Sequence, residues 1–168
     1  MIDRNIVVTG FMGTGKTTVG RVIASRLNRP FVDTDDEIAQ RAGKPVAQIF
    51  AEEGEGYFRY CERRLCRFLA AQRGLVVATG GGMLVDESNR RVMLSSGLVI
   101  CLNAPPEIIS RRLEQSPDER PLLRGNWQAL LDQRAAAYAA IPHQVDTTGK
   151  TPEQIADEII RLWQTLSG

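Results

Sequence analysis

Residues 6–17 read IVVTGFMGTGKT, and this stretch decides the fold. A short apolar run rich in β-branched residues leads into Gly10, and residues Gly10 to Thr17 match the phosphate-loop pattern G-x-x-x-x-G-K-[ST]. The apolar residues after the loop recur at helical spacing, and they are Val19, Val22, Ile23 and Leu27. The stretch therefore predicts a strand, a phosphate-binding loop and an amphipathic helix in direct succession.

The loop has the chemistry that a nucleotide triphosphate needs. Glycines let the backbone curl with its N–H groups inward, and the helix that follows presents the positive end of its dipole to the phosphates. We expect Lys16 to reach the β and γ phosphates and Thr17 to place its hydroxyl on Mg²⁺. The residues expected to hold ATP here are Gly13, Thr14, Gly15, Lys16, Thr17 and Thr18. The alternative is a glycine-rich turn that serves only packing.

Composition narrows the class of protein. The chain has 168 residues and a formal net charge of +1, and its basic residues form no block of the kind that marks a nucleic-acid or membrane surface. No apolar run is long enough to span a membrane, and no export signal is visible, so we expect a cytoplasmic protein. The three cysteines contain no C-x-x-C pair, and a single histidine, His143, cannot build a multi-histidine metal site.

Short β-rich runs alternate with helix-period segments along the chain, which favours βαβ units around a parallel sheet covered by helices. The predicted strands lie at residues 6–9, 31–32, 75–79, 98–102 and around Val145. The predicted helices follow Lys16 and cover residues 55–72, 105–114, 126–140 and the segment that begins with a Thr151 cap. We expect a single α/β domain over residues 1–168, with three layers and a five-stranded parallel sheet. Residues 116–125 contain two prolines and a glycine and are expected to form a mobile lid.

Acidic residues follow the second predicted strand, in Asp33-Thr34-Asp35-Asp36. Ligands bind at the carboxyl edge of a parallel sheet, so we assign Asp33 to a metal's water shell and Asp35 to the substrate. The alternative is that these residues only favour the start of a helix, and we give Asp36 that role. The sequence has no N-K-x-D segment of a GTPase and no late acidic pair of a motor-type ATPase.

Several motifs, in order and without gaps, resemble the shikimate kinase family over nearly the whole chain. The matching segments are Gly10 to Thr17, Asp33-Thr34-Asp35, the G-E-x-x-F-R-x-x-E segment from Gly54 to Glu62, Gly80-Gly81-Gly82, Arg120-Pro121-Leu122-Leu123, and Arg134 with Tyr138. The resemblance implies a P-loop kinase fold and transfer of a phosphoryl group from MgATP to the 3-hydroxyl of shikimate, in aromatic amino-acid (chorismate) biosynthesis. It also suggests a monomer.

The resemblance further implies roles for individual residues. Asp35 would contact substrate hydroxyls and act with Lys16 and Arg120 in catalysis, while Arg59 and Arg134 would hold the substrate carboxylate. A guanidinium suits that task because it presents two parallel N–H donors to a carboxylate. The turn formed by Gly80, Gly81 and Gly82, here called the glycine turn, would supply backbone amides to the substrate. The adenine-flanking positions correspond to Arg112 and Pro152. The aromatic residues Trp127, Tyr138 and Trp163 are expected in the core.

Two alternatives stay open from the sequence. A related small-molecule or nucleotide kinase would use the same two arginines to clamp a different acid or a phosphate. A non-catalytic ATP-binding module would keep the fold without the transfer.

Overall fold

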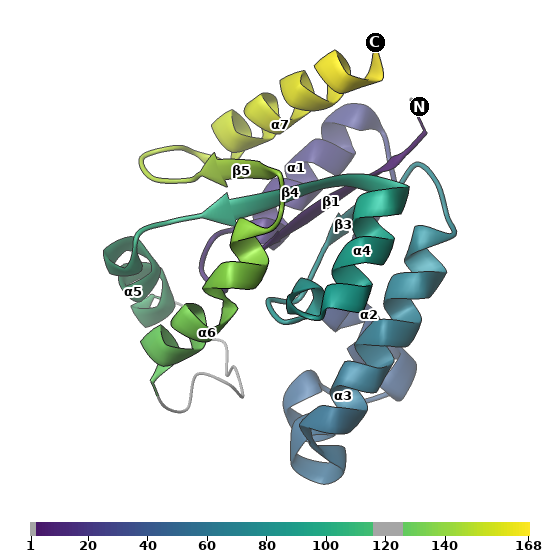
Figure 1. Ribbon diagram of the computed structural model, residues 1–168, viewed down its shortest axis with the longest axis vertical. Helices are drawn as coiled ribbons and strands as arrows, with labels where there is room; N and C mark the ends of the chain where they lie inside the picture. Colours follow the sequence, from purple (N-terminus) through teal and green to yellow (C-terminus); the bar gives the residue numbers. More distant parts are fainter. Residues whose placement is uncertain (1–2, 116–125) are drawn as a thin grey trace.

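The computed structural model describes residues 3–115 and 126–168. Five strands form one sheet in the order β2-β3-β1-β4-β5, and every neighbouring pair is parallel (Figure 1). The strands are β1 (Asn5–Gly10), β2 (Phe31–Asp33), β3 (Val76–Ala78), β4 (Gly97–Asn103) and β5 (His143–Asp146). The predicted five-stranded parallel sheet is confirmed.

Helices cover both faces of the sheet. Helices α1 (Lys16–Leu27) and α7 (Pro152–Ser167) pack together on one face, over a core cluster that includes Ile6 and Val8. The second core cluster includes Val7 and lies under the other elements. These are α2 (Thr34–Ala42), α3 (Val46–Ala70), η1 (Met83–Val85), α4 (Glu87–Ser96), α5 (Pro106–Glu114) and α6 (Trp127–Ala139). Neighbouring residues of β1 point to opposite faces and helices cover both faces, so all of this central strand is buried, and the three-layer prediction is confirmed.

The topology brings the phosphate loop, the acidic segment and the glycine turn to one edge of the sheet. β1 is the central strand, and all six of its residues are buried. Parallel strands end at a common edge, so the loop after β1 lies beside the ends of β2 and β3. The phosphate loop, the acidic segment and the glycine turn therefore meet.

Helix α3 differs from its prediction at both ends. It begins at Val46, and a backbone break at Gly54 (φ 84°, ψ 169°) separates a first segment from the predicted helix, which ends at Ala70. Its buried face also differs, because Phe68 is 52% exposed and carries the Arg41 guanidinium over its ring, whereas Glu62 is only 1% exposed. The helical spacing of the apolar residues between Phe58 and Leu69 predicts that Phe68 faces the core, and for Phe68 that prediction is wrong.

Helix α7 begins as predicted. Thr151 Oγ1 accepts a hydrogen bond from Gln154 N, and Gln154 Oε1 accepts one from Thr151 N, with Pro152 in the first turn. This capping box fixes the position of Pro152.

The predicted lid at residues 116–125, with Arg120, lies outside the described residues. In the rest of the chain, no helix has the length and apolar character that crossing a membrane requires.

Candidate functional site

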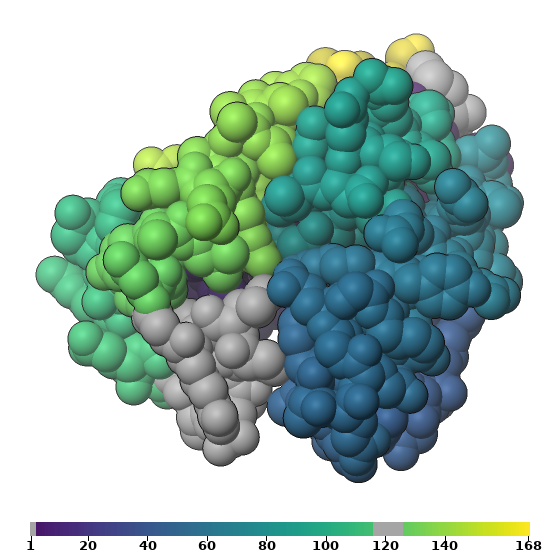
Figure 2. Space-filling view, turned by 60° about the horizontal axis from the view of Figure 1, so that its bottom comes forward, coloured from purple at the N-terminus to yellow at the C-terminus, as the bar shows by residue number. Residues whose placement is uncertain are grey.

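A cleft of about 1100 Å³ opens at the carboxyl edge of the sheet. In Figure 2, the blue surface of α3 and the green surface of α6 form the two sides of this end of the molecule, and residues of both helices line the cleft. Every predicted site residue in the described part of the chain also lines it. They are Gly13, Thr14, Gly15, Lys16, Thr17, Thr18, Asp33, Asp35, Arg59, Gly80, Gly81, Gly82, Arg112, Arg134 and Pro152.

The phosphate loop depends on its glycines. Gly10, Gly13 and Gly15 have φ values of 139°, 79° and 89°, a region that other residues rarely adopt. Gly15 precedes α1, and no side chain caps the first N–H groups of that helix. An uncapped helix start behind a curled backbone is a site for a phosphate.

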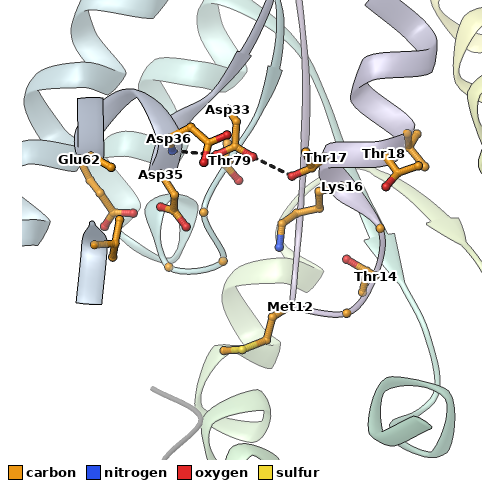
Figure 3. Close-up of a pocket in the computed structure, with 18 of the residues that line it drawn as sticks. Met12, Thr14, Lys16, Thr17, Thr18, Asp33, Asp35, Asp36, Glu62 and Thr79 are labelled. Carbon is orange, nitrogen blue, oxygen red and sulfur yellow. Dashed lines mark hydrogen bonds between the residues drawn. The ribbon is translucent and has the colours of Figure 1, made fainter. Parts of the chain in front are cut away.

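Lys16 folds over the loop that precedes it. Its Nζ donates hydrogen bonds to Gly10 O (2.7 Å) and Phe11 O (3.1 Å). Figure 3 shows Lys16 and Asp35 projecting into the same space from the two sides of the cleft. The ammonium group is thus held where an anion on the loop would meet it.

Thr17 and Asp33 face each other across the cleft. Thr17 Oγ1 donates to Asp33 Oδ2 at 2.7 Å, while Asp33 Oδ1 accepts from Asp36 N at 3.1 Å and so caps α2 (Figure 3). Asp33 therefore caps a helix and also presents an oxygen to the phosphate loop, and Asp36 lies in the first helical turn as expected.

A hydroxyl and a carboxylate suit Mg²⁺, which prefers oxygen ligands and usually keeps several waters. Among residues 3–115 and 126–168, no group of three or more His, Cys, Asp or Glu side chains could hold a metal.

Asp35 lies among charged side chains, but one of its carboxylate oxygens is shielded from solvent. Its Oδ1 is buried and has no hydrogen-bond partner among the described residues. Burial raises the pKa of Asp35 and the charge of Asp33 raises it further, while Lys16 and Arg59 act to lower it. A buried acceptor without a donor is suited to a hydroxyl group of a ligand.

The glycine turn makes room for three charged side chains. A Cβ on Gly80 would collide with the Asp35 carboxylate, and one on Gly82 would collide with the Arg59 guanidinium. A Cβ on Gly81 would lie 3.0 Å from Arg134 Nη1. None of the three has a positive φ, so space rather than backbone conformation requires glycine here.

The three glycine amides are not equivalent. Gly80 N donates to Thr34 Oγ1 at 2.8 Å, so this amide is already used within the protein. Within the described residues, no hydrogen bond involves the N–H of Gly81 or Gly82. These two are the donors that the turn can offer to a ligand.

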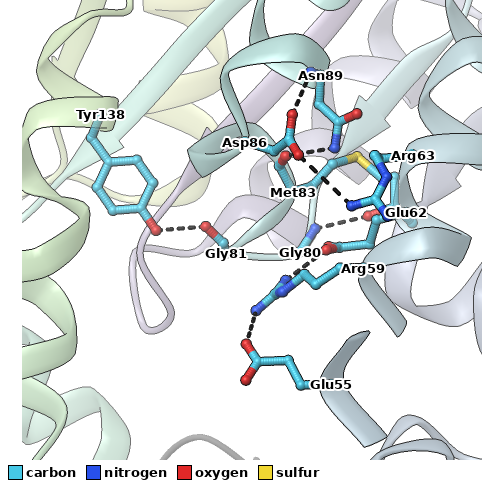
Figure 4. Close-up of polar contacts among 11 residues, drawn as sticks. Glu55, Arg59, Glu62, Arg63, Gly80, Gly81, Met83, Asp86, Asn89 and Tyr138 are labelled. Carbon is cyan, nitrogen blue, oxygen red and sulfur yellow. Dashed lines mark hydrogen bonds and ion pairs between the residues drawn. The ribbon is translucent and has the colours of Figure 1, made fainter. Parts of the chain in front are cut away.

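Arg59 is held by two carboxylates. Its Nη1 donates to Glu62 Oε1 at 2.6 Å and its Nη2 to Glu55 Oε1 at 3.2 Å (Figure 4). Burial acts to lower the pKa of Arg59, but these carboxylates outweigh it and the pKa is raised. Arg59 thus pairs with Glu62 and at the same time lines the cleft.

Glu62 is a site residue that the sequence analysis did not assign. Burial raises its pKa to about 7, although Arg59 acts to lower it. Its Oε2 has no partner in the described part of the chain, and it lines the cleft. Its spacing from Phe58 and Leu65, four residues after one and three before the other, could have placed it on the buried face.

Arg134 and Tyr138 come from successive turns of α6 and are 5% and 6% exposed. The Tyr138 hydroxyl donates to Gly81 O at 2.6 Å (Figure 4). The expected core position of Tyr138 is confirmed, but its polar contact with the glycine turn was missed. The four-residue spacing from Arg134 was the available signal, because residues i and i+4 share a helix face.

Arg112 and Pro152 also line the cleft. Arg112 Nη1 donates to Gly13 O (2.9 Å) and Thr147 Oγ1 (3.1 Å), which ties α5 to the phosphate loop. Lys150, which was not predicted, also lines the cleft and pairs with Glu158 at 2.9 Å.

The arrangement places an anion-binding loop and a pocket for a small acid in one cleft. A phosphoryl donor and its acceptor can therefore meet without the intervention of another domain. The fold and the cleft define a P-loop kinase of the type that includes the nucleoside monophosphate kinases.

Comparisons with known proteins identify the family. The family model described as shikimate kinase matches residues 12–164. The chain is 46% identical over 163 residues to the shikimate kinase of Pelotomaculum thermopropionicum, covering 95% of each chain. It is 51% identical over 148 residues to that of Desulforudis audaxviator, covering 86% of this chain and 78% of the relative.

A solved structure agrees with this assignment. The shikimate kinase from Acinetobacter baumannii in complex with shikimate superimposes with a TM-score of 0.90 at 34% identity, covering 97% of this chain and 94% of the other. The chain belongs to the shikimate kinase family, and the predicted fold class and enzyme are confirmed.

Proposed function

We propose that this cleft transfers the γ-phosphoryl group of ATP to the 3-hydroxyl of shikimate, giving shikimate 3-phosphate and ADP. The observation that carries the proposal is that each glycine of the turn packs against a different charged side chain. The turn thereby gathers one buried carboxylate and two guanidinium groups in the cleft that also contains Lys16. A small acid that also carries hydroxyl groups complements those charges.

At the donor end, the backbone of Gly13 to Thr18 cradles the phosphates and Lys16 neutralises the charge that develops during transfer. Thr17 and Asp33 would hold Mg²⁺, Asp33 through water. When bound, the ion spreads the negative charge of the phosphate oxygens. Arg112 and Pro152 would flank the adenine.

At the acceptor end, Arg59 and Arg134 bind the carboxylate and so orient the ring. Asp35 accepts a hydrogen bond from the attacking hydroxyl through its unpartnered Oδ1. In a loose transition state the hydroxyl need not lose its proton early, so Asp35 contributes mainly by orienting it and receives the proton as transfer completes. Arg120, which lies outside the described residues, would contact the transferring phosphate and exclude water.

We also propose a monomeric cytoplasmic enzyme in which residues 1–168 form one domain. Cys61, Cys66 and Cys101 are free thiols, as expected in a reducing compartment.

The test is acceptor-dependent release of ADP from MgATP, with shikimate, quinate, gluconate and a nucleoside monophosphate compared and the product identified by mass. We expect rapid release only with shikimate. Preference for another acceptor would overturn the substrate, and ATP binding without any acceptor-dependent release would indicate a regulatory module.

A further inference from the structure

The glycine turn is held from two sides by side-chain hydroxyl groups. Thr34 Oγ1 accepts from Gly80 N at 2.8 Å, and Tyr138 Oη donates to Gly81 O at 2.6 Å. Thr34 is fully buried and Tyr138 is 6% exposed, so water does not compete strongly for either bond. The two residues come from α2 and α6, which are far apart in the sequence.

Each hydroxyl belongs to the helix that also carries a charged site residue. Thr34 directly precedes Asp35, and Tyr138 lies one helical turn after Arg134. Asp35 packs against Gly80 and Arg134 against Gly81, the same two glycines that the hydroxyls bind. The turn thus links the hydroxyl-binding end of the acceptor pocket to its carboxylate-binding end.

The bonds also determine where the free amides point. In a planar trans peptide, a carbonyl and the next N–H point in opposite directions. Gly81 O is bound by Tyr138, so the N–H of Gly82 points away from Tyr138. Gly80 O accepts from Met83 N at 3.2 Å, which sets the direction of the Gly81 N–H in the same way. Burial raises the pKa of Tyr138 to about 12, so its hydroxyl keeps its proton and donates at neutral pH.

We propose that Thr34 and Tyr138 are positioning residues for the acceptor. Together they clamp the glycine turn, aim the Gly81 and Gly82 amides, and fix the spacing between Asp35 and Arg134. This inference rests on the proposed function, since it concerns how the same pocket recognises its acceptor. Loss of either hydroxyl should weaken acceptor binding and leave the nucleotide end of the cleft intact.

The test compares steady-state kinetics of Tyr138→Phe and Thr34→Val with wild type. We expect the KM for shikimate to rise about tenfold in each, with the KM for ATP within about twofold of wild type. Thr34→Ser keeps a hydroxyl and should restore the KM for shikimate. Tyr60→Phe and Thr165→Val remove hydroxyls from exposed side chains outside the cleft and should match wild type.

Two outcomes would overturn the proposal. One is an unchanged KM for shikimate in both Tyr138→Phe and Thr34→Val. The other is an equal rise in both KM values, which a general loss of structure would produce. If wild type itself neither binds nor phosphorylates shikimate, the proposed function has failed instead.

A measurement on wild type keeps the test valid if a variant does not fold. Amide hydrogen exchange should show Gly80 protected without substrate, and Gly81 and Gly82 protected only after shikimate is added. Rapid exchange at Gly80, or no change at the other two glycines, would contradict the clamp.

Discussion

Asp35 combines burial with an unpartnered oxygen. We predict that Asp35→Asn lowers kcat by about 10²- to 10³-fold and leaves the Kd of ATP nearly unchanged, because an amide keeps the shape but is a weak acceptor for a hydroxyl proton. The measurements are turnover with shikimate and calorimetric titration with MgATP. Asp36→Asn, in the same helical turn, is the matched control and should stay within a few-fold of wild type. Near-normal turnover in Asp35→Asn would exclude the proposed role.

Glu62 makes the free energy of unfolding depend on pH. Its ordinary pKa of 4.5 is raised to about 7 in the folded protein, chiefly by burial. Between these values the folded state holds a proton that the unfolded chain has released, so the free energy of unfolding falls as pH rises from 4.5 to 7. This difference in pKa corresponds to a loss on the order of 3 kcal/mol, complete above pH 7.

Glu62→Gln tests this dependence. The variant cannot ionise at this position, so its free energy of unfolding should fall less than that of wild type between pH 5 and pH 8. Urea unfolding at both pH values provides the comparison. Glu87→Gln removes the carboxylate of an exposed ion pair with Arg91 and should keep the wild-type slope. Parallel slopes for wild type and Glu62→Gln would show that Glu62 titrates normally.

At the scale of elements, substitutions in the glycine turn after β3 test whether these glycines are needed to leave room for neighbouring side chains. We predict that Gly82→Ala folds but raises the KM for shikimate at least about tenfold, because its Cβ displaces the flexible end of Arg59. Gly56→Ala on α3 meets no neighbouring atom and should leave the KM unchanged while stabilising the helix by up to about 1 kcal/mol. The measurements are the KM for shikimate and the thermal unfolding transition of each variant. A Gly82→Ala enzyme with normal shikimate kinetics would show that Arg59 does not need its observed position.

Elements with strong local signals were predictable. The strand-loop-helix at residues 6–27, the β4 strand and the capping box of α7 match the sequence prediction. The first segment of α3 and helix α4 were not predicted. For α2 the sequence indicated only a helix start at the acidic segment, because α2 has only Ile38 as a fully buried apolar residue. The break at Gly54 depends on how the two parts of α3 pack against neighbouring elements, which periodicity does not report.

At the scale of the whole molecule, nucleotide binding should raise the free energy of unfolding and therefore Tm. A ligand at about 100 times its Kd stabilises the folded state by about 2.7 kcal/mol, which for a chain of this size raises Tm by roughly 5–10 °C. We predict such a shift with MgATP, a smaller one when EDTA removes the ion, and almost none in Lys16→Ala. Lys44→Ala removes a lysine paired with Glu52 outside the cleft and should keep the full shift. A full shift in Lys16→Ala would show that this lysine does not bind the nucleotide.

The sequence by itself determined the sheet and the phosphate loop, and it predicted most, but not all, of the charged residues that line the cleft. Those features depend on local patterns: apolar runs, glycines at fixed offsets and motifs read within a few residues. Only the tertiary structure decided which side chains face one another. That each glycine of the turn faces one charged side chain and that Tyr138 binds Gly81 depend on contacts between distant segments. The burial of Glu62 depends on how α3 packs, although its ion pair with Arg59 is local. The physical reason is that burial and hydrogen-bond partners are set by the packing of helices on the sheet, which no local pattern encodes.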